Sequence, residues 1–449
     1  MSAEKSTIIM TRTLFLITSL VFAALPAFSQ RLMQNDSTGR EGTLQYCVRY
    51  ALAHQPSLQQ SHLDEEITER SIQSHLADWY PQVRLNFNAQ HYPQVPVSIV
   101  QGFPVNVSLQ NSSTAQFSVT QTLFDKDVLL ASSSASDVRD RVRQETVSNN
   151  IDVVVSVSKA YFATLITQKQ IDLIDEEVAR LEEGLKDATA QYRQGVVDKT
   201  DTMRATISLN NAQAERRQDE EFLKARFASL KQLMGYPAET ELRLRYDSTQ
   251  MEQEAYLDTT QTLKYDRRIE FQILQTQRRL EEANVDYYLW SFLPTISAYG
   301  NYSMNYQSNQ TPPLFNKDYP SSFIGLQLSF PIFEGGKRIQ QIKQAQLELD
   351  RVDVGITALK NSLNSEFVQA SANYKSSLGI YAALTQNLAL AQEVYHVIEL
   401  QYKAGTKTYL EVLTAERDLR TAQVNQADAL FQVLSSKLDL QKALGSVQF

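Results

Sequence analysis

The chain has 449 residues, a net charge of −8 at neutral pH, five histidines and a single cysteine. The acidic balance argues against nucleic-acid binding, and one cysteine cannot form a disulfide within the chain. Glycine is scarce, with 14 residues, which favours a helix-rich fold. Motifs for metal binding, nucleotide binding and nucleophilic catalysis are missing, so we expect a protein that is not an enzyme and needs no cofactor.

The first 29 residues have the pattern of a secretory signal peptide. Lys5 and Arg12 precede an apolar stretch over residues 14–25, and small residues at 27–29 offer a cleavage point before Gln30. No later stretch reaches the roughly 18 apolar residues of a transmembrane helix. If the mature chain enters a membrane, we expect it to do so as β-strands in a closed barrel.

The mature chain contains one series of motifs twice. The sequence LADWYP ends at Pro81 and LWSFLP ends at Pro294, 213 residues later, whereas QYRQG and QYKAG end 210 residues apart at Gly195 and Gly405. So steady an offset indicates a duplicated structure. The predicted divisions are a first repeat over 30–235, a linker over 236–260 and a second repeat over 261–449.

Each repeat is expected to hold a helix, two strands and a helical hairpin, in that order. The first repeat has a helix over 43–79 with a break near Pro56, strands over 82–92 and 114–124, and a hairpin over 126–234. The second has a helix over 261–291, strands over 295–306 and 322–333, and a hairpin over 335–444. The first helix of each hairpin has a proline-free pattern of 68 residues, or about 100 Å at 1.5 Å per residue. The loops 94–112 and 307–321 are expected to be exposed.

Periodicity supports these assignments. Apolar residues follow a coiled-coil spacing at Ile174, Val178, Leu181, Leu185, Ala188 and Tyr192, and the same spacing recurs 210 residues later. We interpret this seam as a packed core without chemistry. The charge clusters at 175–177 and 215–217 are interpreted as solvated helix faces. Val83, Leu85 and Phe87 alternate with polar residues, as expected of strands near the 9–11 residues that cross a bilayer.

The strand count determines the predicted assembly. Four strands per chain are too few for a single-chain barrel, which starts at about eight, and open edges are not tolerated in lipid. The fold class predicted is mainly α with a membrane β-barrel: two repeats with long antiparallel coiled-coil hairpins, and four strands contributed to a twelve-stranded barrel shared by a trimer. The alternative is a periplasmic coiled-coil adaptor or structural spacer without a membrane barrel.

Two further motifs carry a family resemblance. Residues 330–336 read FPIFEGG and residues 402–413 read YKAGTKTYLEVL. Together with the duplicated Pro81 and Pro294, they resemble the outer-membrane efflux protein family, the TolC-like exit ducts of Gram-negative bacteria. The resemblance implies a homotrimeric passive channel in outer-membrane lipid, gated at its periplasmic helical tips. It also implies a tripartite efflux pump or type I secretion system, with a periplasmic adaptor and an inner-membrane transporter as partners.

The same resemblance assigns the site residues. A network that closes the tunnel falls on Asp201, Tyr402, Lys407 and Glu411, whereas Thr414 stands where the family has a second acid, which weakens the case for a cation-blocking ring. Adaptor docking falls on the hairpin tips, at Gly195, Val196, Gly405 and Thr406. From the residues alone, charge at a narrow mouth can set selectivity, but the same residues can be solvent-exposed turn residues without a special role.

Overall fold

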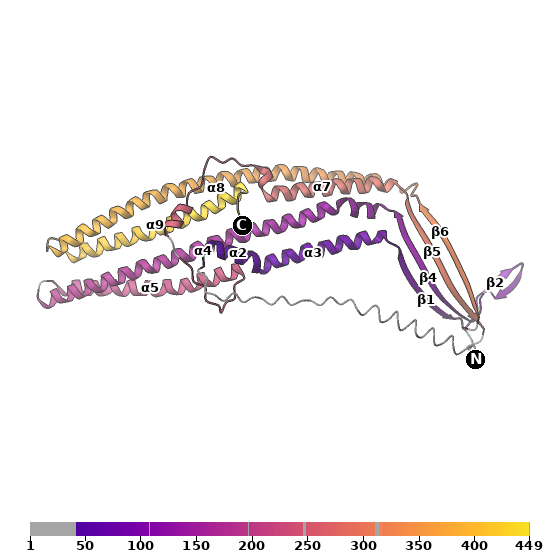
Figure 1. The fold of residues 1–449 in the computed structure, drawn as a ribbon, viewed down its shortest axis with the longest axis horizontal. Coiled ribbons are helices and arrows are strands. Elements are labelled where there is room, and N and C mark those ends of the chain that lie inside the picture. The colour runs from indigo at the N-terminus through magenta and orange to yellow at the C-terminus, as the bar shows by residue number, and fades with distance from the viewer. Residues whose placement is uncertain are drawn as a thin grey trace. The chain divides into compact units, whose positions relative to one another are not determined.

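The computed structural model of the protein describes residues 42–106, 108–195, 197–245, 248–309, 315 and 317–448. The predicted signal peptide and Val196 lie outside these residues. From Gly42 onward the chain forms one unit, in which an α-helical part continues into a β-sheet (Figure 1).

Long helices dominate this unit. The two hairpins are α4 (Lys126–Arg193) with α5 (Lys199–Met234), and α8 (Lys337–Lys403) with α9 (Tyr409–Leu444). Shorter helices are α2 (Leu44–His54), α3 (Pro56–Leu76), α6 (Ser248–Glu254) and α7 (Ile269–Leu289), with single 3-10 turns at Ala77–Trp79, Tyr265–Arg267 and Trp290–Phe292. Within the described residues, no helix combines the length and the apolar character needed to cross a membrane.

Four antiparallel strands form the main sheet, in the order β1-β4-β5-β6. They are β1 (Gln82–His91), β4 (Asn111–Phe124), β5 (Thr295–Ser308) and β6 (Asp318–Ser329). The last strand begins earlier than the sequence indicated and ends before residue 333. Pro331 explains this end, because proline has no N–H to donate to a sheet. The first expected loop contains a small hairpin that the sequence analysis missed, β2 (Val97–Val100) with β3 (Phe103–Asn106).

The helices pack in an order that parallels the sheet. Helix α4 packs against α5 and α9, and α9 packs against α8, so α5 and α8 are the outer members of the row. Helix α3 packs on α4, and α7 packs on both α4 and α8. Figure 1 shows α3 beside α4 and α7 beside α8, along the halves of these long helices that lead to the strands. Each repeat therefore contributes one inner and one outer element to both the helical row and the sheet.

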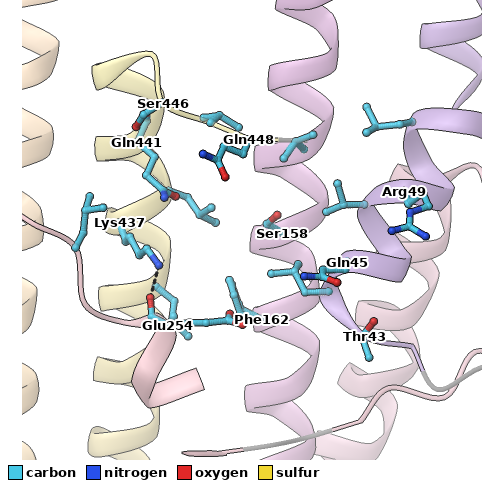
Figure 2. Close-up of a pocket in the computed structure, with 18 of the residues that line it drawn as sticks. Thr43, Gln45, Arg49, Ser158, Phe162, Glu254, Lys437, Gln441, Ser446 and Gln448 are labelled. Carbon is cyan, nitrogen blue, oxygen red and sulfur yellow. Dashed lines mark hydrogen bonds between the residues drawn. The ribbon is translucent and has the colours of Figure 1, made fainter. Parts of the chain in front are cut away.

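The main core lies where the hairpins meet the short helices and the linker. It includes the fully buried Cys47, whose pKa is raised to about 12 by burial, as expected of a small packed helix residue. Tyr374 is also fully buried; its hydroxyl donates to the Ala255 carbonyl at 2.8 Å. Figure 2 shows a pocket of about 870 Å³ between α2, α4 and α9, where Lys437 donates to the backbone carbonyl of Glu254 and so ties the linker to α9.

Candidate functional site

The two faces of the four-stranded sheet differ in polarity. Strand register places Leu85 beside Phe117, and Phe117 beside Tyr302. On this face the strands carry one acidic residue, Asp318, which lies beside Tyr306 at one end of the sheet. The most exposed side chains of the face include Ile324 at 93% and Leu326 at 74%. Its apolar members across the four strands are Val83, Leu85, Phe87, Ala89, Ala115, Phe117, Val119, Ile296, Ala298, Met304, Pro320, Ile324, Leu326 and Leu328. Such a face fits lipid rather than water.

The opposite face is mostly polar. Arg84 lies beside Ser118 in the register, and Ser118 lies beside Asn301. Thr114 donates from its hydroxyl to Asn305 across β4 and β5 at 3.0 Å. Because side chains alternate along a strand, the predicted alternation is confirmed, and this face has the polar character of the inside of a barrel channel.

The two hairpin tips share one backbone geometry. Gly195 and Gly405 both have a φ of +77°, the left-handed conformation that ends a helix with little strain only in glycine. A Cβ atom at either glycine would meet nothing within 4 Å, so backbone conformation rather than packing requires these glycines. At the second tip Thr406 donates its N–H to the Gln401 carbonyl at 3.0 Å.

The four predicted gate residues lie near these tips but do not form one network within the chain. Lys407, in the turn before α9, donates at 2.6 Å to Glu411 in the first turn of that helix, and this bond is the first cause that lowers the pKa of Glu411 to about 2. Asp201 lies 3.9 Å from the guanidinium of Arg204. The Tyr402 hydroxyl donates to Gln191 at 3.4 Å and so reaches the first hairpin. Pairing between neighbouring hairpins of different copies stays a prediction.

A partly buried cluster of charges, which we call the clasp, joins the hairpins further from the tips. It consists of Glu177 and Arg180 on α4, Glu215 on α5, and Glu416 and Arg420 on α9. Arg180 donates to Glu416 at 3.0 Å, and the Glu416 side chain is only 6% exposed. Arg420 donates to Glu215 at 3.2 Å. Three helices are therefore tied together by two guanidinium groups.

The clasp has more acid than base and is only partly hydrogen-bonded. Arg420 Nε lies 3.0 Å from Glu177 Oε2, but both atoms lack an aligned hydrogen bond among the described residues, so this contact is an ion pair by distance alone. Burial raises the pKa of Glu177 and the pKa of Glu416, although arginines oppose the shift in each case. Burial also raises the pKa of the adjacent Asp219. Desolvation therefore outweighs pairing at these carboxylates.

The clasp corrects one interpretation from the sequence. The cluster at 175–177 is not wholly a solvated face, because the Glu177 side chain is 15% exposed and faces Arg420, whereas Asp175 pairs with Arg216 at the surface. A signal existed in α9, where Glu416 and Arg420 lie four residues apart on a face otherwise made of Val412, Ala415 and Leu419. Two charges on a buried apolar stripe indicate charged partners on the facing helix.

Comparison with known proteins identifies the family. The sequence profile described as "Outer membrane efflux protein" matches residues 48–236 and 265–446. The outer membrane protein TolC of Vibrio cholerae is 21% identical over 362 residues, covering 78% of this chain and 82% of that protein. The alkaline protease secretion protein AprF of Pseudomonas aeruginosa is 23% identical and is covered over 68% of its length, with 73% of this chain. The crystal structure of VceC from Vibrio cholerae aligns with a TM-score of 0.71 at 18% identity, covering 90% of this chain and 96% of that one.

The chain belongs to the outer membrane efflux protein family, as its motifs indicated. It is an outer-membrane protein and serves as an exit duct. The predicted fold of the chain, mainly α with four long antiparallel strands, is confirmed, since the solved outer membrane protein VceC has the same fold over nine-tenths of this chain. A periplasmic adaptor or spacer without membrane strands is not supported.

Proposed function

We propose that three copies of the chain join edge to edge into one passive duct. The sheet ends in β1 on one side and β6 on the other, and the helical row ends in α5 and α8. The proposal rests on the observation that the sheet and the helical row are each open at two sides. A copy placed beside β6 also comes beside an outer helix, so one rotation can close both parts at once.

The number of copies follows from the strand count. Unpaired strand edges cannot face hydrocarbon, because their N–H and C=O groups would have no partners. Two copies would supply eight strands, and barrels of that size are filled by their own side chains. Three copies supply twelve strands, which leave room for a lumen lined by the polar face that contains Arg84 and Asn301.

The outer helix α8 supports this arrangement. It exposes nine large apolar side chains along its length, and Leu347 and Val354, one heptad apart, are 68% and 70% exposed. An apolar stripe of this extent indicates a contact surface, and the neighbouring copy's outer helix α5 is the surface that edge-to-edge closure brings to it. The nine side chains are Ile339, Leu347, Val354, Val368, Ile380, Leu390, Val394, Val397 and Leu400.

We infer that the duct is gated at the hairpin tips and works with partners. Tyr402, Lys407, Asp201 and Glu411 would pair across neighbouring hairpins in the closed state. A periplasmic adaptor would dock around Gly195 and Gly405, with Val196 and Thr406 beside them, and an inner-membrane transporter would drive export. The relatives support both kinds of export, because one is named for protease secretion and others for toluene or antibiotic efflux.

The assembly is tested by measuring the mass of the detergent-extracted particle together with its single-channel conductance. We expect a particle of about three times the 51.0 kDa chain that conducts ions in a planar bilayer. A water-soluble monomer or dimer without conductance would overturn the channel.

The gate is tested separately in the same bilayer. Lys407→Ala and Tyr402→Phe are each expected to raise the conductance, because each removes a contact that would hold neighbouring hairpins together. The control is Lys224→Ala, which removes an exposed pair with Glu221 on α5. Unchanged conductance in both gate variants would contradict the gate assignment but would not contradict the proposed trimer.

A further inference from the structure

The connection between β1 and β4 carries a hairpin of its own. Strands β2 and β3 are joined by Gln101 and Gly102, which have φ values of +50° and +82°. Two consecutive left-handed residues are typical of the tight turn that fits the twist of a two-stranded hairpin. Figure 1 shows this hairpin beyond the end of the four-stranded sheet that lies away from the helices. In an outer-membrane duct that end faces outward from the cell.

Both faces of this hairpin are exposed and mainly apolar, with one polar residue on each, Asn106 and Ser98. Strand register puts Ile99 beside Pro104 on one face and Val100 beside Phe103 on the other. Ile99 is 76% exposed and Phe103 is 72% exposed. The whole stretch of residues 92–124 contains no charged residue. An isolated two-stranded hairpin is marginal in water, so this one requires cover on both faces.

A lipid surface is a poor match for such an element. A segment lying in the membrane interface has one apolar and one polar face, and basic residues that meet the headgroups. This hairpin has neither property. A ring of identical hairpins does provide two-sided cover, because in a three-fold arrangement each copy presents one face to the preceding copy and the other to the following copy.

The hairpin is also long enough to reach the axis of the barrel. Twelve strands spaced about 4.8 Å apart and tilted by about 40° give a radius of about 12 Å. Each arm of the hairpin, four strand residues and one turn residue, extends about 17 Å. Hairpins rooted at the wall can therefore meet above the lumen.

We propose that the hairpins 97–106 of three copies meet over the outer mouth of the duct and form an apolar constriction. The proposal rests on the proposed trimer. A ring of Ile99, Val100 and Phe103 side chains would slow the passage of hydrated ions and bulky charged solutes without stopping ion conduction, because narrow apolar passages hold water poorly. The duct would then have a second barrier, at the end opposite to the helical tips.

Contact between the hairpins is tested by cross-linking in the full-length trimer. Cys47→Ala removes the only native thiol, and Phe103→Cys then places one thiol on each hairpin. We expect oxidation to give a cross-linked dimer on denaturing gels. Lys317→Cys, on the other outward connection, is the matched control and is expected to stay monomeric. A trimer in which Phe103→Cys does not cross-link any faster than the control would overturn the proposal.

The barrier is tested by access to the lumen from outside. Asn301→Cys, in the Cys47→Ala chain, places a thiol on the polar face of β5, and a bulky charged thiol reagent is added to whole cells. Adding Ile99→Ser and Phe103→Ser is expected to raise the labelling rate several-fold. An unchanged rate would overturn the constriction, and this readout does not depend on whether the helical tips are open.

The outcomes separate this proposal from the trimer. If the extracted particle is not a trimer, the proposed assembly fails, and the cap fails with it. If the particle is a conducting trimer without cross-links, only the cap fails. A fluorophore on Phe103→Cys that is quenched by nitroxide-labelled lipids would show instead that the hairpins lie apart in the outer leaflet.

Discussion

The inner and outer helices of the row differ in how much of their surface the chain itself covers. The inner helix α9 buries fifteen residues, whereas its repeat-related counterpart α5, of the same 36-residue length, buries four. Helix α9 lies between α4 and α8, while α5 packs mainly on one long helix of the described chain, α4. The duplicated sequence therefore produces two similar hairpins in different surroundings. The exposed outer surface is where we expect other copies to bind.

The largest expected effect comes from placing charge on the outer surface of α8. Leu347→Glu combined with Val354→Glu would bury two carboxylates where two apolar side chains pack against the next copy. The trimer loses about 2 kcal/mol of favourable burial free energy for each apolar side chain that is replaced. Burying the two carboxylates adds a desolvation penalty. We expect the detergent-stable trimer to dissociate, as measured by light scattering.

The matched control adds the same charge to the same helix without removing apolar surface. Gln346→Glu combined with Thr357→Glu changes two exposed polar positions, and we expect it to leave the mass unchanged. A trimer that survives the apolar substitutions as well would show that α8 is not a seam.

The second effect concerns the clasp between the inner helices. Arg420→Met would leave Glu177 and Glu215 without their main cation, and removal of one partner from a buried pair costs about 3–5 kcal/mol. Arg216→Met is the control, because it removes an exposed partner of Asp175 and should cost less than about 1 kcal/mol. We expect a much lower unfolding temperature for Arg420→Met. Equal losses in the two variants would contradict a structural role for the clasp.

The sequence predicted the features that depend on periodicity and repetition. Both hairpins, the four long strands and the alternation at Val83 and Leu85 follow from local patterns that survive in the fold. The hairpin at 97–106 was missed although Gln101-Gly102 lies between alternating apolar residues, because proline at 96 and 104 favoured a loop. The clasp was missed for another reason. Burial of Glu177 depends on Arg420, which lies 243 residues away in the sequence.

The clasp and the second tip should respond to acid in opposite directions. Burial raises the pKa of Glu416 in the folded chain, so the protein binds that proton more tightly than the unfolded chain does. Above the raised pKa, ionised Glu416 destabilises the folded chain. This destabilisation is removed as the pH falls toward the usual pKa of glutamate, near 4.5. The pKa of Glu411 is lowered, so its stabilising contribution is lost only as the pH falls from about 4.5 toward 2.

The interval from pH 7.5 to 5 therefore isolates the clasp. As the pH falls over this interval, we expect the unfolding temperature of the native sequence to rise relative to that of Glu416→Gln, because glutamine cannot take up a proton. The measurement is the difference between the two proteins at each pH, which cancels titrations elsewhere in the chain. A difference that does not change with pH would show that Glu416 keeps an ordinary pKa.

The smallest effect separates the two tips, which share a backbone but differ in capping. At the second tip Thr408 and Glu411 form a reciprocal capping box, whereas at the first tip Asp198 accepts only from the adjacent Lys199 N–H at 3.2 Å. Thr408→Ala should cost about 1 kcal/mol, and Asp198→Ala should cost less, because its bond does not reach the second or third helical N–H. Hydrogen exchange in the first turns of α9 and α5 measures both. A larger loss of stability for Asp198→Ala would mean that the first tip has a partner beyond its own backbone. The gate proposal places such a partner on the neighbouring copy's hairpin.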